Sequence, residues 1–226
     1  MKIIEDLWQV GGEGLTAPGD AAVYLVRFGP QAALVDAGCG PGHQRLVDNV
    51  SACLPSGTVV THLLLTHCHF DHSGGAAALR EHYGCRIIAH TQDAVFLEAG
   101  DDRVTAAAWY GARMRPLTVD YRITAGRETI AVGDGMLTAH HCPGHSPGSL
   151  VFTTRRHGRT VLFAQDVHGP LHPSLLSDAA RYRDSLRYLL TLEADILCEG
   201  HFGVQQGRVA VKNFIRRYLH ASDQGL

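Results

Sequence analysis

One short run constrains the fold of this chain more than any other feature. Thr66-His67-Cys68-His69-Phe70-Asp71-His72 carries three imidazoles and one carboxylate within six positions. Neutral imidazole and carboxylate are the side chains that borderline divalent metals such as zinc accept. Ordinary folding gives no reason for such a density of ligand-type side chains, so we expect the fold to place this run where its side chains can converge.

The flanking residues predict where the run lies. His62-Leu63-Leu64-Leu65 is a short apolar run typical of a buried strand, and Ser73-Gly74-Gly75 opens an Ala-rich helical pattern. The run therefore lies on a turn at a strand end. There the first two histidines can point to one centre, while Asp71 and His72 point to a second one a few ångström away. A single ion would not use them all.

The alternative is a polar surface loop, because isolated histidines are usually just that and the chain has 15 histidines. Three downstream segments argue against it: 142–148, 163–166 and 197–201. Each follows the end of an apolar, β-branched-rich run and places one ligand-type residue on the next loop, namely His145, Asp166 and His201. Strand-end loops on one edge of a sheet are where sites assemble on a rigid scaffold.

From Val35-Asp36-Ala37-Gly38 through the His-x-His-x-Asp-His run to His201, the chain resembles the metallo-β-lactamase superfamily of hydrolases. The resemblance covers nearly the whole chain. It implies an α/β fold, the four-layer αββα sandwich in which two mixed β-sheets lie face to face with helices outside.

The same resemblance implies a site with two metal ions. The first ion would be held by His67, His69 and His145, the second by Asp71, His72 and His201, and Asp166 would bridge the two. Asp36 would support the metal loop from behind.

Two positions depart from the superfamily pattern. Gln165 precedes Asp166 where glycine is common, and Phe202 follows His201, but neither change removes a ligand. The β-lactamases of the first subclass have a cysteine at the position of Asp166. The aspartate here, together with the lack of a secretory signal, disfavours antibiotic hydrolysis as the function.

Composition predicts an ordinary soluble protein. The 226 residues are 45% hydrophobic, and a formal net charge of −2 offers no basic field for nucleic acid. No run approaches the roughly 20 apolar residues of a membrane span. We therefore expect one domain over residues 1–226, located in the cytoplasm, with a small-molecule substrate and no nucleic-acid or membrane partner. The sequence does not indicate an oligomeric state.

The six cysteines show no Cys-x-x-Cys pair and lie mainly in or beside apolar runs, so we expect buried free thiols. Cys68 and Cys142 flank proposed ligands. Because Cys68 lies between two histidines, its side chain should point to the opposite side of the chain from theirs. We therefore do not expect it to be a metal ligand.

Hydrophobic periodicity predicts strands at 3–10, 23–28, 32–36, 62–65, 86–90, 137–141, 150–154, 161–164 and 194–198, and helices at 43–54, 76–83, 92–99, 179–190 and 210–218. Tyr182 could assist at the carbonyl as a tyrosine does in the lactonases, but its place on an apolar helical stripe favours a core role. His168, soon after Asp166, is a candidate for contact with the site or the substrate.

Segment 101–122 fits no clean periodicity. It carries Trp109, Tyr110, Arg113, Met114 and Arg115. Such a segment could roof the site and recognise substrate, or it could be a helix whose aromatic residues only pack on the body.

The resemblance implies hydrolytic chemistry. Two bridged ions would share a water and lower its pKa from about 15.7 to near 7, so that a bridging hydroxide could attack a carbonyl carbon. Asp71 would orient this nucleophile and pass its proton to the leaving group. We predict a metal-dependent hydrolase of a small ester, thioester or lactone, with Asp71 as its catalytic residue and two divalent ions, zinc before iron or manganese.

Other functions stay open. A persulfide dioxygenase shares this fold but holds one iron through two histidines and an aspartate, as His67, His145 and Asp166 could do. A β-lactamase-like enzyme, a phosphodiesterase and a non-catalytic metal-binding module are further alternatives. The metal motif also resembles that of glyoxalase II, but one helix accounts for the residues after His201, so we do not expect the helical region that binds glutathione.

Overall fold

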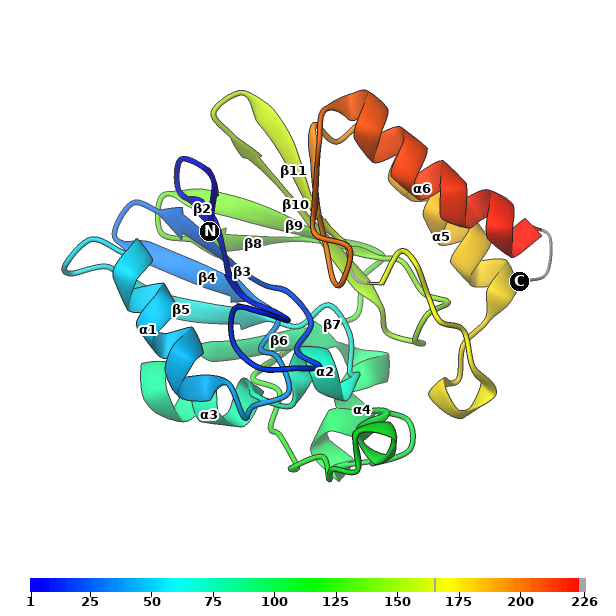
Figure 1. Ribbon diagram of the computed structural model, residues 1–226, viewed down its shortest axis with the longest axis horizontal. Helices are drawn as coiled ribbons and strands as arrows, with labels where there is room; N and C mark the ends of the chain where they lie inside the picture. The colour runs from blue at the N-terminus through cyan, green and yellow to red at the C-terminus, as the bar shows by residue number, and fades with distance from the viewer. Residues whose placement is uncertain (165, 224–226) are drawn as a thin grey trace.

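The computed structural model describes residues 1–164 and 166–223 and contains two β-sheets packed face to face (Figure 1). The first sheet has the order β1 (Lys2–Ile4), β2 (Leu7–Gly11), β3 (Val23–Phe28), β4 (Gln31–Val35), β5 (Val59–Leu64), β6 (Arg86–His90) and β7 (Tyr121–Ile123). The second has the order β13 (Val204–Gln206), β12 (Ile196–Glu199), β11 (Arg159–Ala164), β10 (Leu150–Arg156), β9 (Gly135–His141) and β8 (Arg127–Val132). Both sheets mix parallel and antiparallel pairs.

Helices cover the outer face of each sheet (Figure 1). The helices on the first sheet are α1 (His43–Cys53), α3 (Ala76–Tyr83) and α4 (Thr91–Ala99), and those on the second are α5 (Ala179–Thr191) and α6 (Arg208–Asp223). The remaining helical turns are α2 (Phe70–Ser73), η1 (Ala107–Tyr110) and η2 (Pro173–Leu175). The expected four-layer αββα sandwich is thereby confirmed.

Three apolar layers hold the sandwich together. The central layer lies between the sheets and includes Phe28, Phe152 and Phe163, and the other two lie between each sheet and its helices. Burial of apolar side chains is the dominant favourable term in folding. The layers therefore fix the positions of the strand ends from which the loops leave.

The strand directions explain why the loops meet. Strand β10 is antiparallel to both β9 and β11, and β11 is parallel to β12, so β9, β11 and β12 all end at the same edge. The loop after β5 reaches this edge from the other sheet, where the Leu150 amide donates a 2.7 Å hydrogen bond to the Thr66 carbonyl. Four loops far apart in sequence therefore lie side by side.

Several predicted elements need correction. The strand expected at 3–10 is two strands, because Asp6 takes a left-handed φ of 62° and turns the chain between them. The plain turn expected for the metal run contains the short helix α2, and β7, β8 and β13 were not predicted. Strand β13 lies after His201, where only a helix was expected. Among the described residues, no helix has the length and apolar character needed to cross a membrane.

Candidate metal centre

Asp36 fixes the loop that follows β5. One carboxylate oxygen accepts the Thr66 amide at 2.8 Å, and the other accepts the Thr66 hydroxyl at 2.8 Å. This second oxygen also lies 2.8 Å from Nδ1 of His72. Both ends of the run 66–72 are thus attached to one buried carboxylate, which confirms the supporting position expected for Asp36.

Hydrogen bonds to Nδ1 orient the histidine rings. Because the Thr66 hydroxyl donates to Asp36, its oxygen is free to accept from Nδ1 of His67, 3.1 Å away. Nδ1 of His145 donates to the Pro170 carbonyl at 3.0 Å. These partners assign the proton to Nδ1 and leave the Nε2 lone pair of each ring facing the centre, as metal-binding histidines require.

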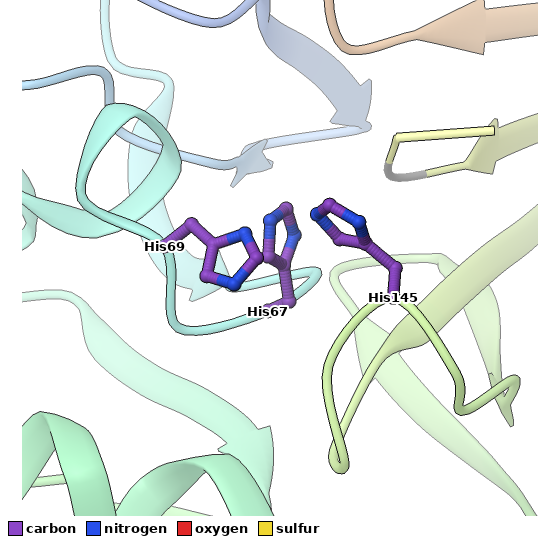
Figure 2. Close-up of side chains that lie close together, drawn as sticks. All are labelled: His67, His69 and His145. Carbon is purple, nitrogen blue, oxygen red and sulfur yellow. The ribbon is translucent and has the colours of Figure 1, made fainter. Parts of the chain in front are cut away.

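Three histidines form the first group of ligand-type side chains. His67, His69 and His145 are buried, and one ring nitrogen of each lies within 4.8 Å of those of the others. Their rings point toward one another from two separate loops (Figure 2). Burial lowers the pKa of His69 to about 3, so its imidazole is neutral at physiological pH and available as a ligand.

A second group lies beside the first and consists of Asp71, His72, Asp166 and His201. Nε2 of His201 is 3.1 Å from Oδ2 of Asp71. Asp166 faces both groups: its Oδ2 is 3.4 Å from Nε2 of His145, and its Oδ1 is 3.1 Å from Nε2 of His72. An aspartate placed in this way has one oxygen for each of two neighbouring cations.

Five buried polar atoms in these groups have no hydrogen-bond partner among the described residues. They are Nε2 of His67, His69, His72 and His145, and Oδ1 of Asp166. Nε2 of His72 lies 3.1 Å from Oδ1 of Asp166 without a hydrogen bond between them. Each unsatisfied buried group costs about 1–3 kcal/mol. Folding alone does not account for five in one place, whereas bound divalent cations would satisfy all of them.

The second group carries concentrated negative charge. Burial disfavours a charged imidazole there, but the carboxylates of Asp166, Asp71 and Asp36 outweigh it and raise the pKa of His72 well above its ordinary value. Burial also lowers the pKa of His201, but the carboxylates of Asp166 and Asp71 outweigh it and raise this pKa to about 10. This part of the site therefore attracts positive charge, which a divalent cation can provide.

Two buried acids that were not predicted hold the loops together. Asp93, from α4, accepts from the Cys68 amide at 2.9 Å and from the Ser146 hydroxyl at 2.6 Å. Glu199 accepts the His201 amide at 2.7 Å. Asp93 could not be distinguished in the sequence from an ordinary acid in the first turn of a helix. Glu199 is the last residue of an apolar strand. An acid at the end of a buried strand was the one sequence feature that could have indicated its role in holding the loop.

A cavity of about 170 Å³ lies over the two groups. Besides the ligand-type residues His69, Asp71, His145, Asp166 and His201, it is lined by Ala106, Trp109, Tyr110, His168, Pro170 and Leu175. Segment 101–122 therefore contributes walls to the cavity through Trp109 and Tyr110. Met114 is buried in the core, and Arg115 pairs with Glu81 on the surface. A larger cavity of about 580 Å³ is lined by other residues, from the second sheet and its turns together with Phe28 of β3.

The other candidates also have clear places. His168 lies 2.9 Å from Glu199 and packs its ring 5.0 Å from that of His201. Tyr182 is buried, and its hydroxyl donates to the Val167 carbonyl, which supports the core role. Cys68 is buried in the apolar layer under α3 and α4, away from the two groups. No disulfide joins the described cysteines, and five of the six are buried as expected, while Cys53 is half-buried. Gln165 lies outside the described residues.

Comparisons with known proteins agree with this geometry. The family model of the metallo-beta-lactamase superfamily matches residues 16–201. The acyl-coenzyme A thioesterase MBLAC2 of Gallus gallus is 31% identical over 165 residues, which are 65% of this chain and 57% of the relative. The hydroxyacylglutathione hydrolase of Anaeromyxobacter dehalogenans is 35% identical over 132 residues, 58% of this chain and 41% of the relative. The chain thus spans about half the length of these relatives.

Among solved structures, a motif mutant of a metallo-beta-lactamase from Cronobacter sakazakii superimposes with a TM-score of 0.81 at 22% identity. The match covers 100% of this chain and 95% of that one. At this identity the likeness shows the fold alone, while the family model matches most of the sequence. The chain belongs to the metallo-beta-lactamase superfamily.

Proposed function

We propose that this protein is a hydrolase that cleaves an ester, thioester or lactone bond of a small acyl substrate with two divalent cations, zinc in the first place. The observation that carries the proposal is the position of Asp166, whose two carboxylate oxygens face two separate groups of buried ligand atoms. The names of the relatives, a thioesterase and a hydroxyacylglutathione hydrolase, support cleavage of an acyl bond.

The chain's own side chains would hold both cations. His67, His69 and His145 would bind the first, Asp71, His72 and His201 the second, and Asp166 both. Cations held in this way lower the pKa of a water toward 7 and polarise a carbonyl oxygen. The buried carboxylate of Asp36 fixes the ring of His72, and the Pro170 carbonyl fixes that of His145, so the ligand atoms are oriented in advance.

Asp71 would transfer the proton in the proposed reaction. It lines the cavity, and its Oδ2 is 3.1 Å from His201. In the proposed reaction a water oxygen bonds to the acyl carbon, and the bond from that carbon to the leaving oxygen or sulfur breaks. Asp71 accepts the proton of the water and returns it to the leaving atom, so the products are a carboxylic acid and an alcohol or thiol.

A panel assay with metal analysis tests this function. Zinc-loaded protein is assayed without oxygen against thioesters, lactones, β-lactams and phosphodiesters. We expect two zinc ions per chain and turnover of an acyl ester, thioester or lactone. One iron per chain with oxygen consumption would instead identify a dioxygenase and contradict the proposal, as would turnover of phosphodiesters or β-lactams alone.

Two variants and a control refine this assay. Asp71→Ala and His67→Ala should each lower kcat/KM by a factor of a hundred or more, since each removes a group needed to activate or orient the water. His220→Ala, which changes an exposed histidine on α6, should leave it within about twofold. Wild-type turnover by Asp71→Ala at verified zinc content would contradict the role given to Asp71.

A further inference from the structure

The walls of the cavity over the metal centre are each attached to a ligand loop. On one side, the Phe70 amide donates a 2.7 Å hydrogen bond to the Thr105 carbonyl, and the ring of Tyr110 packs 5.7 Å from that of Phe70. This contact attaches η1 to the run that contains His69 and Asp71. The position of η1 is therefore set by the site itself.

The opposite wall depends on His145. The Pro170 carbonyl accepts from Nδ1 of His145, and the Ser177 hydroxyl donates to the His145 carbonyl at 2.7 Å. Ser177 in turn accepts the His172 amide at 3.1 Å. The segment between Pro170 and Ser177, which includes η2, is thereby held at both ends against one proposed ligand.

The two walls contact each other through an aromatic pair. The ring of Trp109 in η1 lies 5.3 Å from that of His172, at an interplanar angle of 83°. Edge-to-face packing of this kind is favourable for aromatic rings. Trp109 lines the cavity, and both side chains are exposed, so this contact joins the two loops at the surface and is called the Trp109–His172 bridge below.

The space between these walls is small, and the residues that line it besides the ligand-type side chains are mostly apolar. Its volume of about 170 Å³ is below the roughly 300–1,000 Å³ of pockets for drug-sized ligands. At about 30 Å³ for each water-sized group, it has room for about six such groups, including the attacking water and the carbonyl. The described lining residues include neither lysine nor arginine, and Ala106, Trp109, Pro170 and Leu175 provide apolar surface.

We propose that this space is the acyl pocket of the enzyme, and that the Trp109–His172 bridge restricts it to short, uncharged acyl groups of about two to four carbons. The inference rests on the proposed acyl-bond hydrolysis and deepens it. A longer chain would collide with the bridge. A carboxylated chain would bring a negative charge into a cavity that also contains Asp71 and Asp166, and the described lining includes no lysine or arginine to pair with it.

The test is a chain-length series on one leaving group. Zinc-loaded protein is assayed with acetyl, butanoyl, hexanoyl, decanoyl and succinyl thioesters of N-acetylcysteamine. We expect kcat/KM to fall at least tenfold from butanoyl to decanoyl and from butanoyl to succinyl, since one misfitting methylene changes such a ratio about 10- to 200-fold.

Variants of the bridge should change this preference. Trp109→Ala and His172→Ala each remove one half of the bridge and should raise the decanoyl-to-butanoyl ratio at least tenfold. Tyr121→Ala changes an exposed aromatic residue on β7, outside the described lining, and should leave the ratio within twofold. Equal ratios in wild type and both bridge variants, or a wild-type preference for decanoyl or succinyl thioesters, would overturn the acyl-pocket assignment.

A binding measurement separates this inference from the proposed function. The chain has two tryptophans, so in Trp8→Phe the tryptophan fluorescence comes from Trp109 alone. Butanoate should change this fluorescence saturably in zinc-loaded protein, and decanoate should not do so at the same concentrations. If no acyl substrate is turned over, the proposed function fails, and the fluorescence alone decides whether the pocket accepts short acyl groups. An equal response to both acids, or none to butanoate, overturns the inference.

Discussion

The Asp93 carboxylate accepts a 2.6 Å hydrogen bond from the Ser146 hydroxyl. The same oxygen accepts the Cys68 amide at 2.9 Å, and the other oxygen accepts the Gly148 amide at 2.6 Å. One buried acid of α4 therefore joins the loop after β5 in the first sheet to the loop after β9 in the second. These loops carry His67, His69 and His145, so the distance between the ligands depends on Asp93.

Asp93→Asn should loosen this connection. An amide has one acceptor oxygen where the carboxylate has two, so at least one of the buried donors loses its partner, at about 1–3 kcal/mol each. We expect the free energy of unfolding to fall by about 2–4 kcal/mol in denaturant titrations, and zinc affinity in chelator competition to fall about 10- to 100-fold. Asp48→Asn, at an exposed position of α1, is the control. Wild-type values for both variants would show that Asp93 does not hold the loops.

Asp36→Asn tests the orientation of His72. Asp36 has a left-handed φ of 65°, which asparagine also tolerates, so the backbone should be unaffected. The variant can no longer accept from Thr66 and His72 at the same time through two charged oxygens. We predict a zinc affinity about 10- to 100-fold weaker, measured by competition with a chromogenic chelator. An unchanged affinity for the second zinc ion would refute the role of Asp36.

The glycine before His145 offers a test of packing at the site. Gly144 has φ +131°, and a Cβ there would lie 2.1 Å from the Tyr182 amide nitrogen. Gly144→Ala should lower the free energy of unfolding by about 3 kcal/mol or more, through overlap and backbone strain together. Gly158 has φ +75° with no described atom within 4 Å, so Gly158→Ala should cost only about 1–2 kcal/mol of strain. Equal losses in thermal or urea unfolding would contradict this account.

A buried histidine away from the metal centre should make stability depend on pH. Nδ1 of His140 lies 2.8 Å from the Tyr188 hydroxyl and its Nε2 2.8 Å from that of Thr153, and burial lowers the pKa of His140 to about 4. Between its unfolded value of about 6.5 and pH 4, the unfolded chain binds more protons than the folded one, so stability falls as pH falls.

His140→Gln should reduce this slope. Urea titrations of zinc-free protein between pH 7 and pH 4 measure it, and the zinc-free form avoids the competing release of metal. His157→Gln, an exposed histidine on the turn between β10 and β11, is the control and should keep the wild-type slope. A slope in His140→Gln as steep as that of the wild type would rule out His140 as its source.

Hydrophobic spacing within a short segment was sufficient to predict the elements that depend on that segment alone. The helix at Ala76–Tyr83 and the strand at Arg86–His90 were predicted with these bounds, because apolar spacing and the left-handed Gly84 mark them within a few residues. Helix α2 was not predicted, since four residues are too few to show a helical period. Strand β8 buries only Ile130 and Val132, which is too weak an alternation to identify it from sequence.

The convergence of the two ligand groups could be expected from motif order and a family resemblance, but their supports could not. Asp93 contacts Ser146, 53 positions away, and Glu199 holds His168 across 31 positions. Trp109 meets His172 only because two loops are bent toward each other. Such contacts depend on how distant segments pack, and periodicity within one segment carries no information about them.

Anomalous diffraction from zinc-loaded crystals, with data on both sides of the zinc edge, is the most direct test of the central claim. We predict two zinc peaks per chain. One should lie about 2.0–2.2 Å from the ligand nitrogens of His67, His69 and His145, the other at the same distance from Asp71, His72 and His201, and Asp166 should contact both. A single peak, or two peaks ligated by other side chains, would contradict it.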